Sequence, residues 1–382
     1  SKQLKKDELY IDYAKTEKEY YIFTIDSSSN VNFIAIDKNS SKEIDGYIKA
    51  FRANIDMIVK DTKLATQKSK HSKEILSKLY QATIQKPLGD ILKEKSSLII
   101  STDGALRAMP FEAMYDTQDQ KYLIEQKNIR YISSGRELVR LFRYSKQHKS
   151  EDIAVIFSNP NFDANISDTR TARLVEQDDI AELFELKFGA LKGTIEEAKR
   201  IEKILKKDNK VISYSQTDAN ETTLLEVKKP KILHLATHGF FINDKNIPNP
   251  MLKSGIVLSG ANYNAFHNDK DYGVVTALKL SGLNLKGTDL AVLSACSTGV
   301  VDLDSTENIS GLSKAFIQAG AKDVVMSLWE VDDMKTMELM SSFYKNSQKS
   351  HNYAKALRAT KIEMIKVGLH PYYWSPFILS GM

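Results

Sequence analysis

Short apolar runs alternate with amphipathic stretches from about residue 153 onward, and this pattern limits the fold more than any other feature of the chain. The apolar runs have the character of buried strands and lie at 153–157, 211–214, 232–236, 256–258, 290–294, 324–328 and 377–379. The stretches with helical periodicity lie at 194–206, 309–318, 334–344 and 353–366. Strands that alternate with helices are typical of crossover connections between parallel strands. The pattern therefore predicts an α/β fold with a mostly parallel sheet flanked by helices.

The first 150 residues follow a different pattern. Three short alternating runs separated by polar turns predict an antiparallel meander at 9–14, 20–25 and 31–36. Apolar residues then recur every three or four positions from Ile44 to Ile58, which predicts a helix, and a second amphipathic helix follows it. We therefore expect two halves, an N-terminal half at 1–150 and a second half at 151–382.

A thiol and an imidazole follow two of the predicted parallel strands. Cys296, the one cysteine of the chain, comes after the run at 290–294, and His238 comes after the run at 232–236. The carboxyl ends of parallel strands meet at one edge of a sheet, where active sites form, so we expect the two side chains to lie together. A lone buried cysteine is by itself more often a small hydrophobe, and a lone histidine a turn residue. The pair at two strand ends instead favours a nucleophile, Cys296, with its base, His238.

Small residues surround the predicted nucleophile. Ala295, Ser297 and Gly299 leave room for the backbone of a substrate to approach the thiol. Backbone amides at such a position stabilise the oxyanion that forms when a thiolate attacks a carbonyl. The amides of Gly239 and Cys296 are the candidates.

Several segments resemble one known family. The segments HLATHGFF at 234–241, LAVLSACSTG at 290–299, GLSKAFIQAGAKDVVMSLWEVDD at 311–333 and HPYYWSPFILSG at 370–381 are similar to motifs of the CHAT domain. This caspase-like domain belongs with the caspases, separases and gingipains and is often attached to tetratricopeptide repeats in bacteria. Weaker matches lie upstream, at 101–114, 156–162 and 191–201, so the resemblance covers nearly the whole chain.

The resemblance implies a fold, an activity and a context. It implies one CHAT domain, in which residues 1–150 form a catalytically empty half and residues 151–382 form the caspase-like catalytic half. It also implies that His238 is the general base and Cys296 the nucleophile of a peptide-bond hydrolase. An upstream repeat region that senses a signal is common in the family. No repeat with a period near ~34 residues is visible in this sequence, so we expect the chain to be either a fragment of something longer or a stand-alone form.

Composition and charge exclude several other classes. With 42% hydrophobic and 27% charged residues, the chain has the composition of an ordinary globular protein. No apolar stretch is long enough to span a membrane, and a single cysteine forms no internal disulfide, so we expect a cytoplasmic protein. The net charge of +5 divides into +7 for residues 1–150 and −2 for 151–382, but the lysines are scattered among acids. We therefore expect no direct nucleic-acid contact and no membrane contact.

The remaining polar residues suggest no cofactor and no metal. The histidines outside the pair lack the spacing of metal ligands, and the glycines fit no phosphate-binding loop. His234 lies inside an apolar run and is expected to be a core histidine with a hydrogen-bond partner. Carboxylates after two strands are candidates for binding a basic substrate residue: Asp302, Asp304, Glu330, Asp332 and Asp333. For Asp332 and Asp333, capping of the helix that follows is the preferred interpretation.

These features lead to one hypothesis and two alternatives. The hypothesis is a cysteine endopeptidase that cleaves a specific protein partner under the control of an upstream sensor or regulatory partner, with a role in bacterial defence. The first alternative is a catalytically silent caspase-like scaffold that binds proteins. The second is another thiol acyl-transfer enzyme, such as a transamidase.

Overall fold

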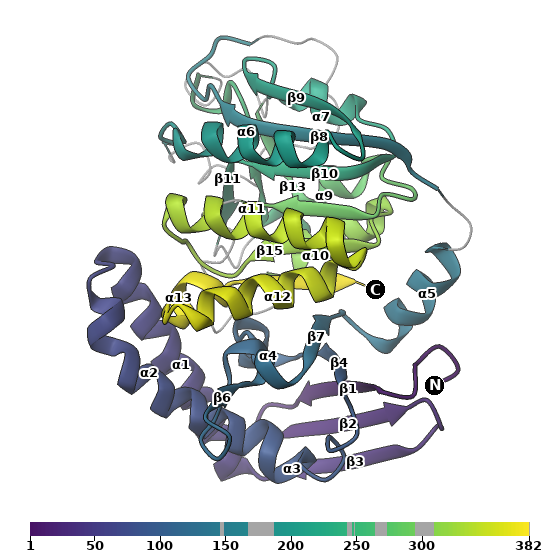
Figure 1. Ribbon diagram of the computed structural model, residues 1–382, viewed down its shortest axis with the longest axis vertical. Helices are drawn as coiled ribbons and strands as arrows, with labels where there is room; N and C mark the ends of the chain where they lie inside the picture. The colour runs from purple at the N-terminus through teal and green to yellow at the C-terminus, as the bar shows by residue number, and fades with distance from the viewer. Residues whose placement is uncertain are drawn as a thin grey trace. The chain divides into compact units, whose positions relative to one another are not determined.

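The computed structural model describes residues 1–145, 149–166, 187–242, 247, 249–263, 273–294 and 309–381. Contacts divide the chain into two compact units. Figure 1 colours the chain from purple at the N-terminus to yellow at the C-terminus. Unit 1 consists of Ser1–Arg143 and Asn346–Met382, and unit 2 of Tyr144–Lys345. The junction after Arg143 lies near the expected boundary, whereas the packing of residues 346–382 with unit 1 differs from the expected division. The interpretation of 1–150 and 151–382 as an empty and a catalytic half stays a prediction.

Unit 1 contains the predicted meander at one edge of a mixed sheet. The strands β1 (Glu8–Lys15), β2 (Tyr20–Asp26) and β3 (Val31–Ile36) are antiparallel to one another, as predicted. The strands β4 (Ser97–Ser101), β7 (Asn128–Tyr131) and β16 (Phe377–Gly381) extend this sheet in parallel. The strand order in unit 1 is therefore β3-β2-β1-β4-β7-β16. The short strands β5 (Tyr115–Asp116) and β6 (Lys121–Tyr122) form a separate hairpin.

The predicted helical pair of unit 1 is also present. Helix α1 (Lys38–Lys60) and helix α2 (Leu64–Tyr80) lie side by side in Figure 1 and are in contact. Asp37 caps α1 by accepting hydrogen bonds from the backbone N–H groups of Asn39 and Ser40. The apolar stripe of α1 that runs from Ile44 to Ile58 is fully buried. Helix α2 continues through a π-helical turn (Gln81–Gln85) into α3 (Lys86–Leu88).

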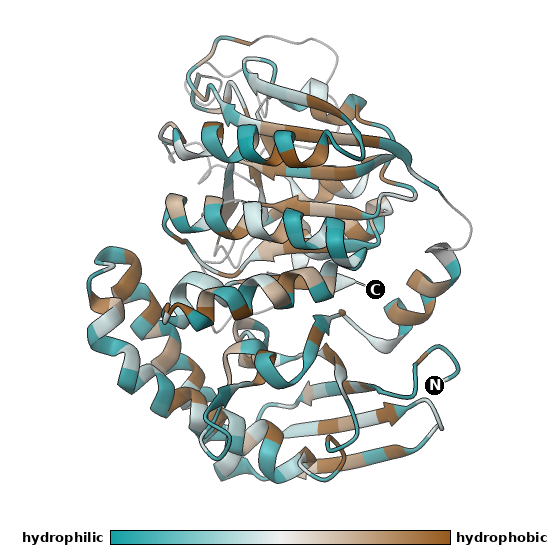
Figure 2. Ribbon diagram, in the orientation of Figure 1, coloured by the Kyte–Doolittle hydropathy of each residue, from teal (hydrophilic) through white to brown (hydrophobic). Residues whose placement is uncertain are grey.

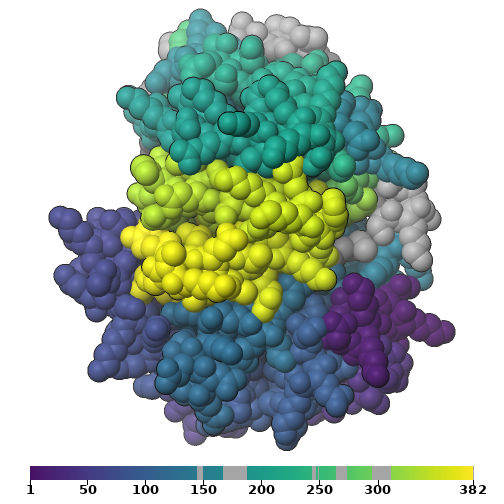
Figure 3. All heavy atoms as spheres, in the orientation of Figure 1, coloured from purple at the N-terminus to yellow at the C-terminus, as the bar shows by residue number. Residues whose placement is uncertain are grey.

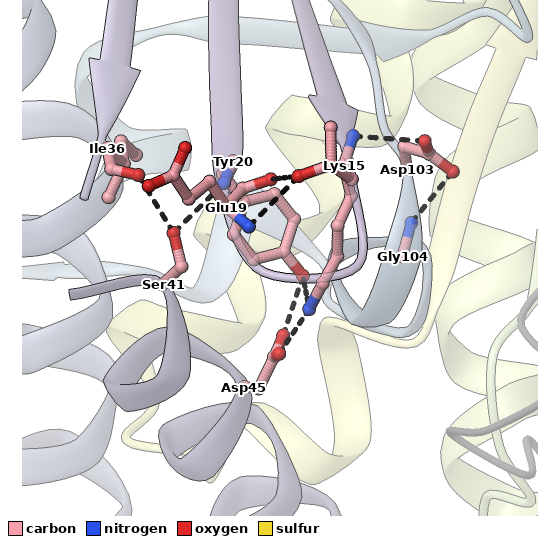
Figure 4. A network of polar contacts seen from close by, with 9 residues as sticks. Lys15, Glu19, Tyr20, Ile36, Ser41, Asp45, Asp103 and Gly104 are labelled. Carbon is pink, nitrogen blue, oxygen red and sulfur yellow. Dashed lines mark hydrogen bonds and ion pairs between the residues drawn. The ribbon is translucent and has the colours of Figure 1, made fainter. Parts of the chain in front are cut away.

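A polar network joins the meander, α1 and the turn after β4 (Figure 4). The carboxylate of Asp45 pairs with the Lys15 ammonium and accepts a hydrogen bond of 2.7 Å from the hydroxyl of Tyr20. Asp103 accepts a hydrogen bond from the backbone N–H of Lys15 at 3.1 Å. At Gly104, φ is +58°, and a Cβ there would lie 2.4 Å from Cδ of Lys15, so this turn requires glycine.

A buried ion pair connects the two segments that form unit 1. The ammonium of Lys361, on α12 (Tyr353–Lys366), lies 3.1 Å from the carboxylate of Glu112. The other carboxylate oxygen of Glu112 accepts a hydrogen bond from the hydroxyl of Tyr131. Burial lowers the pKa of Lys361, and burial together with the Glu112 charge raises the pKa of Tyr131. The remaining helices of unit 1 are α4 (Leu123–Gln126), α5 (Gly135–Ser145, which runs across the junction) and α13 (Pro371–Trp374).

Unit 2 contains the parallel sheet that the sequence predicts. Its strands are β8 (Glu151–Pro160), β9 (Lys210–Gln216), β10 (Pro230–Ala236), β14 (Leu290–Leu293) and β15 (Asp323–Ser327). Every pairing among them is parallel, and the order in unit 2 is β9-β8-β10-β14-β15. The inner strands β10, β14 and β15 are predominantly apolar, as the brown segments of Figure 2 show, because both faces of the sheet are covered there, whereas the edge strand β9 has no fully buried residue.

Helices cover both faces of this parallel sheet. Helices α6 (Gly193–Leu205) and α11 (Asp333–Ser350) lie on the near face in Figure 1, and their side chains close over it in Figure 3. Helices α9 (Ala277–Ser281) and α10 (Ile309–Ala319) pack together behind the sheet. The short helix α7 (Glu221–Glu226) follows β9. No helix in the described ranges is long and apolar enough to cross a membrane.

The prediction that the run at 256–258 belongs to the parallel sheet was wrong. This run lies in β12 (Ser254–Val257), the middle strand of a small antiparallel sheet with β11 (His238–Phe241) and β13 (Val274–Thr276). The connection from β11 to β12 contains no crossover helix in its described residues, and the two strands pair directly with each other. A direct return of this kind makes strands antiparallel.

Candidate functional site

The site begins where β10 ends and the chain turns into β11. Thr237 separates the two strands, is fully buried, and donates a hydrogen bond to the carbonyl of Val257 on β12. This bond fixes the sharp turn, so that His238 begins β11 just past the carboxyl end of β10. Active sites of open α/β sheets form at this edge.

The strand that leads to Cys296 runs beside β10. Leu235 of β10 pairs with Leu293 of β14, and the N–H of Ser294 donates a hydrogen bond of 3.0 Å to the carbonyl of Leu235. His238 is three positions after Leu235, and Cys296 is three positions after Leu293. Cys296 itself lies outside the described residues. Its role as the nucleophile, and that of its amide in an oxyanion hole, stay predictions.

The imidazole of His238 is framed by two aromatic rings from other segments. Its ring centroid lies 5.2 Å from that of Phe162, which follows β8, and 5.7 Å from that of Phe188. Both phenyl rings belong to an apolar cluster that also includes Phe240 and Leu191. Packing on two sides restricts the rotation of the imidazole and leaves the ring half-buried.

One ring nitrogen of His238 has a backbone partner. Nε2 lies 2.8 Å from the carbonyl oxygen of Gly189. A carbonyl oxygen only accepts hydrogen bonds, so Nε2 carries a proton and donates it to this contact. In the neutral imidazole, Nδ1 is then the nitrogen that accepts a proton. The sequence offered no orienting group for this histidine, and the structure provides a peptide carbonyl rather than an acid.

The backbone N–H of Gly239 points away from β12. The N–H of Ile242 donates a hydrogen bond to the carbonyl of Lys253, and Gly239 pairs in register with Ile256. Along an antiparallel strand, successive residues direct their N–H groups alternately toward the partner strand and away from it. Ile242 directs its N–H toward β12, and Gly239 is three residues earlier, so the N–H of Gly239 is directed to the opposite side of β11. This orientation is compatible with the predicted use of the Gly239 amide as an oxyanion donor, which stays a prediction.

The sequence model of one family matches residues 73–382, which is most of the chain; its description is the CHAT domain. The chain belongs to the CHAT domain family. The predicted resemblance is thereby confirmed, and the match begins within α2, so that the meander and α1 precede it. No curated protein matches the sequence at a significant level.

Solved structures show which fold this CHAT domain has. A Saccharomyces cerevisiae separase–securin complex superposes with a TM-score of 0.59 at 10% sequence identity and covers 100% of this chain. A second separase–securin complex from the same organism gives a TM-score of 0.55, also at 10% identity and 100% coverage. The Arg-specific cysteine proteinase gingipain R gives a TM-score of 0.44 at 8% identity, over 81% of this chain and 66% of that chain. This CHAT domain spans about 30% of the length of either separase chain.

The observed fold agrees with the fold that the family resemblance predicted. This CHAT domain has the caspase-like fold that separase shares, a mostly parallel sheet flanked by helices.

The predicted substrate carboxylates fall into two groups. Asp302 and Asp304 lie outside the described residues. Glu330, Asp332 and Asp333 follow the carboxyl end of β15 and are exposed. Asp332 caps α11, since its Oδ1 accepts a hydrogen bond of 3.1 Å from the backbone N–H of Lys335. The preferred interpretation of this residue as a helix cap is therefore confirmed.

Asp333 lies against the first residue of α6. A Cβ added to Gly193 would come within 2.7 Å of Oδ2 of Asp333. Glycine at this position therefore allows the close approach of the carboxylate to the amino end of α6, where a negative charge is favourable.

Two other expectations concern histidines and metals. His234 is fully buried, and its two ring nitrogens lie 3.1 Å from the hydroxyl of Tyr344 and 3.1 Å from the carboxylate of Glu197, so it is the core histidine that was predicted. Within the described ranges, no three His, Cys, Asp or Glu side chains are grouped to hold a metal ion. The expectation of a site without a metal or cofactor stays a prediction.

Proposed function

We propose that this CHAT domain is a cysteine endopeptidase in which His238 is the general base and Cys296 the nucleophile. The main support is the imidazole of His238: it lies at the carboxyl end of β10, beside the strand that leads to Cys296, and its Nε2–H is bound to the Gly189 carbonyl. This contact leaves Nδ1 as the proton acceptor, and a neutral imidazole with one unprotonated nitrogen is what activation of a thiol requires.

The proposed reaction has two stages. In the first, Nδ1 of His238 takes the thiol proton of Cys296, and the thiolate forms a bond to the carbonyl carbon of the scissile peptide. The resulting tetrahedral oxyanion collapses, the C–N bond breaks, and Nδ1–H gives its proton to the leaving amine. In the second stage, Nδ1 takes a proton from water, whose oxygen attacks the thioester, and the thiol is released with that proton.

The amides of Gly239 and Cys296 are proposed to stabilise the oxyanion. Support for the first comes from the ladder geometry, in which the N–H of Gly239 is not directed at β12. The Gly189 carbonyl contributes differently, because it accepts a hydrogen bond from the imidazole in both protonation states. It thereby keeps the ring in one orientation while Nδ1 gains and loses a proton.

The proposed substrate is a protein partner with a basic residue before the scissile bond. This preference rests on the carboxylates Asp302, Asp304 and Glu330, which follow the carboxyl ends of β14 and β15 in the chain. For Asp332 and Asp333 the contacts with α11 and Gly193 favour structural roles. Control by an upstream sensor or a regulatory partner, a cytoplasmic location and a role in bacterial defence are further parts of the proposal, supported by membership of the CHAT family.

A peptide library tests this proposal. Incubated with the wild-type protein and analysed by mass spectrometry, a mixture of diverse peptides should be cleaved after a narrow set of residues, with basic residues enriched. Cys296→Ala and His238→Ala should each abolish these products. Cleavage that continues unchanged in Cys296→Ala would contradict the assignment of the nucleophile.

Two alternative functions make different predictions. A scaffold that binds proteins without catalysis gives no cleaved peptides from any variant. A transamidase gives products that carry an added amine instead of water, which the same mass spectra distinguish when a primary amine is supplied.

A further inference from the structure

Two loops that frame His238 come from distant parts of the chain. Phe162 follows β8, whereas Phe188 and Gly189 precede α6. Neither loop belongs to β10 or β11, and among the described residues no backbone hydrogen bond joins Phe162, Phe188 or Gly189 to those two strands. The position of the imidazole therefore depends on the contacts that hold these two loops together.

The buried side chain of Asn262 connects the two loops. Its Nδ2 donates a hydrogen bond of 2.9 Å to Oδ1 of Asp163 in the first loop and another of 2.9 Å to the carbonyl of Phe188 in the second. Its Oδ1 accepts a hydrogen bond of 2.9 Å from the N–H of Phe188. The backbone N–H of Asn262 also donates to the carbonyl of Phe162, at 2.9 Å. Asn262 is 3% exposed, so its amide makes these bonds from a buried position.

We propose that Asn262 is a positioning residue for His238. By binding both the N–H and the carbonyl of Phe188, its amide fixes the peptide orientation just before Gly189, whose carbonyl accepts the Nε2–H of His238. By binding Asp163 and the carbonyl of Phe162, it holds the other ring that packs against the imidazole. This inference rests on the proposed function of His238 as the base.

The chemistry of the contacts explains why an amide is required. A side chain at this position has to accept from one N–H and donate to two oxygens, and only asparagine does so at this length. Aspartate at this position would keep the acceptor for the Phe188 N–H, but its second oxygen would face the oxygens of Asp163 and Phe188. Alanine would leave the N–H and carbonyl of Phe188 and the carboxylate of Asp163 without these hydrogen bonds.

Alkylation of the thiol by iodoacetamide at pH 6 provides the test. Cys296 is the one cysteine of the chain, so intact mass reports its modification without interference. The rate constant is measured for wild type, Asn262→Ala, His238→Ala and the double variant, and the melting temperature is recorded for each. Asn262→Asp, which preserves the side-chain volume, serves as a second variant.

The expected result is a coupling between the two residues. In wild type the thiol should react about tenfold or more faster than free cysteine, and His238→Ala should reduce the rate to that of a free thiol. Asn262→Ala should lower the rate about tenfold in the wild-type background but change it less than about twofold in the His238→Ala background. Asn262→Asp should behave like Asn262→Ala.

A matched control separates positioning from a general loss of stability. Asn346 is also buried, and its amide donates a hydrogen bond of 3.1 Å to the hydroxyl of Thr360 in unit 1. Asn346→Ala should lower the melting temperature without changing the alkylation rate. An unchanged rate in both Asn262 variants, or equal losses in the two backgrounds, would overturn the inference about Asn262. A rate that His238→Ala does not lower would instead overturn the proposed role of His238.

Discussion

His370 shows how a single buried side chain makes the stability of unit 1 depend on pH. Its Nδ1 accepts a hydrogen bond of 3.0 Å from the backbone N–H of Tyr372 at the start of α13. Burial, together with the nearby charge of Lys73, lowers the pKa of His370 from 6.5 to about 4. The folded protein therefore keeps this imidazole neutral at a pH where the unfolded chain protonates it.

Acidification should destabilise unit 1 through this residue. The contribution is fully present above pH 6.5 and is lost as the pH falls toward 4, because only the unfolded state gains the proton in that window. The loss in the free energy of unfolding should reach about 3 kcal/mol. In a Trp329→Phe background, the fluorescence of the buried Trp374 reports the denaturant-induced unfolding of unit 1.

His370→Asn is the matched variant, since asparagine retains a hydrogen-bond acceptor for the Tyr372 N–H but does not titrate. Its stability should decrease less than that of the wild type between pH 7 and pH 4.5. The same decrease in both proteins would show that His370 does not cause the acid sensitivity.

At the level of elements, the apolar runs predicted the strands of the parallel sheet, and helical periodicity predicted α6, α10 and α11. The short helices α7 and α9 were not predicted. The run at 256–258 was assigned to the wrong sheet because its composition resembles that of β14 and β15. β12 differs from them because it pairs directly and antiparallel with β11. The amino-acid composition of the run does not indicate this pairing. Periodicity also gave no indication that α12, α13 and β16 belong with unit 1, since that grouping follows from long-range packing such as the Lys361–Glu112 pair.

Asp332 provides a test at the amino end of α11. Loss of an N-cap costs about 1 kcal/mol, so Asp332→Ala should destabilise unit 2 by about that amount, whereas Asp332→Asn should be nearly neutral. Unfolding followed by Trp329 fluorescence in a Trp374→Phe background measures this difference. The peptide-library cleavage pattern should be the same for both variants as for wild type. A loss of the preference for basic residues in Asp332→Asn would instead assign this carboxylate to substrate binding.

At the scale of the whole molecule, part of the site follows from the order of the strands and part from contacts between distant segments. His238 and Cys296 each follow an apolar run, so strand topology alone predicts that they share an edge of the sheet. Phe162, Phe188 and Asn262 could not be assigned in this way, because they lie in segments far apart in the sequence that meet only in the folded unit. The partner of Nε2 is a backbone carbonyl, a group that every residue carries and that sequence therefore cannot single out.

The central claim is that His238 activates Cys296 for attack on a peptide carbonyl. Labelling with a set of peptidyl acyloxymethyl ketones, which react with an activated thiol held beside a bound peptide, tests it most directly. Intact mass and peptide mapping should show one label, on Cys296 of the wild-type protein. Labelling should be fastest with a peptide whose last residue is basic. His238→Ala should remove the label. Equal labelling of wild type and His238→Ala, or labelling no faster than that of a free thiol, would contradict the claim.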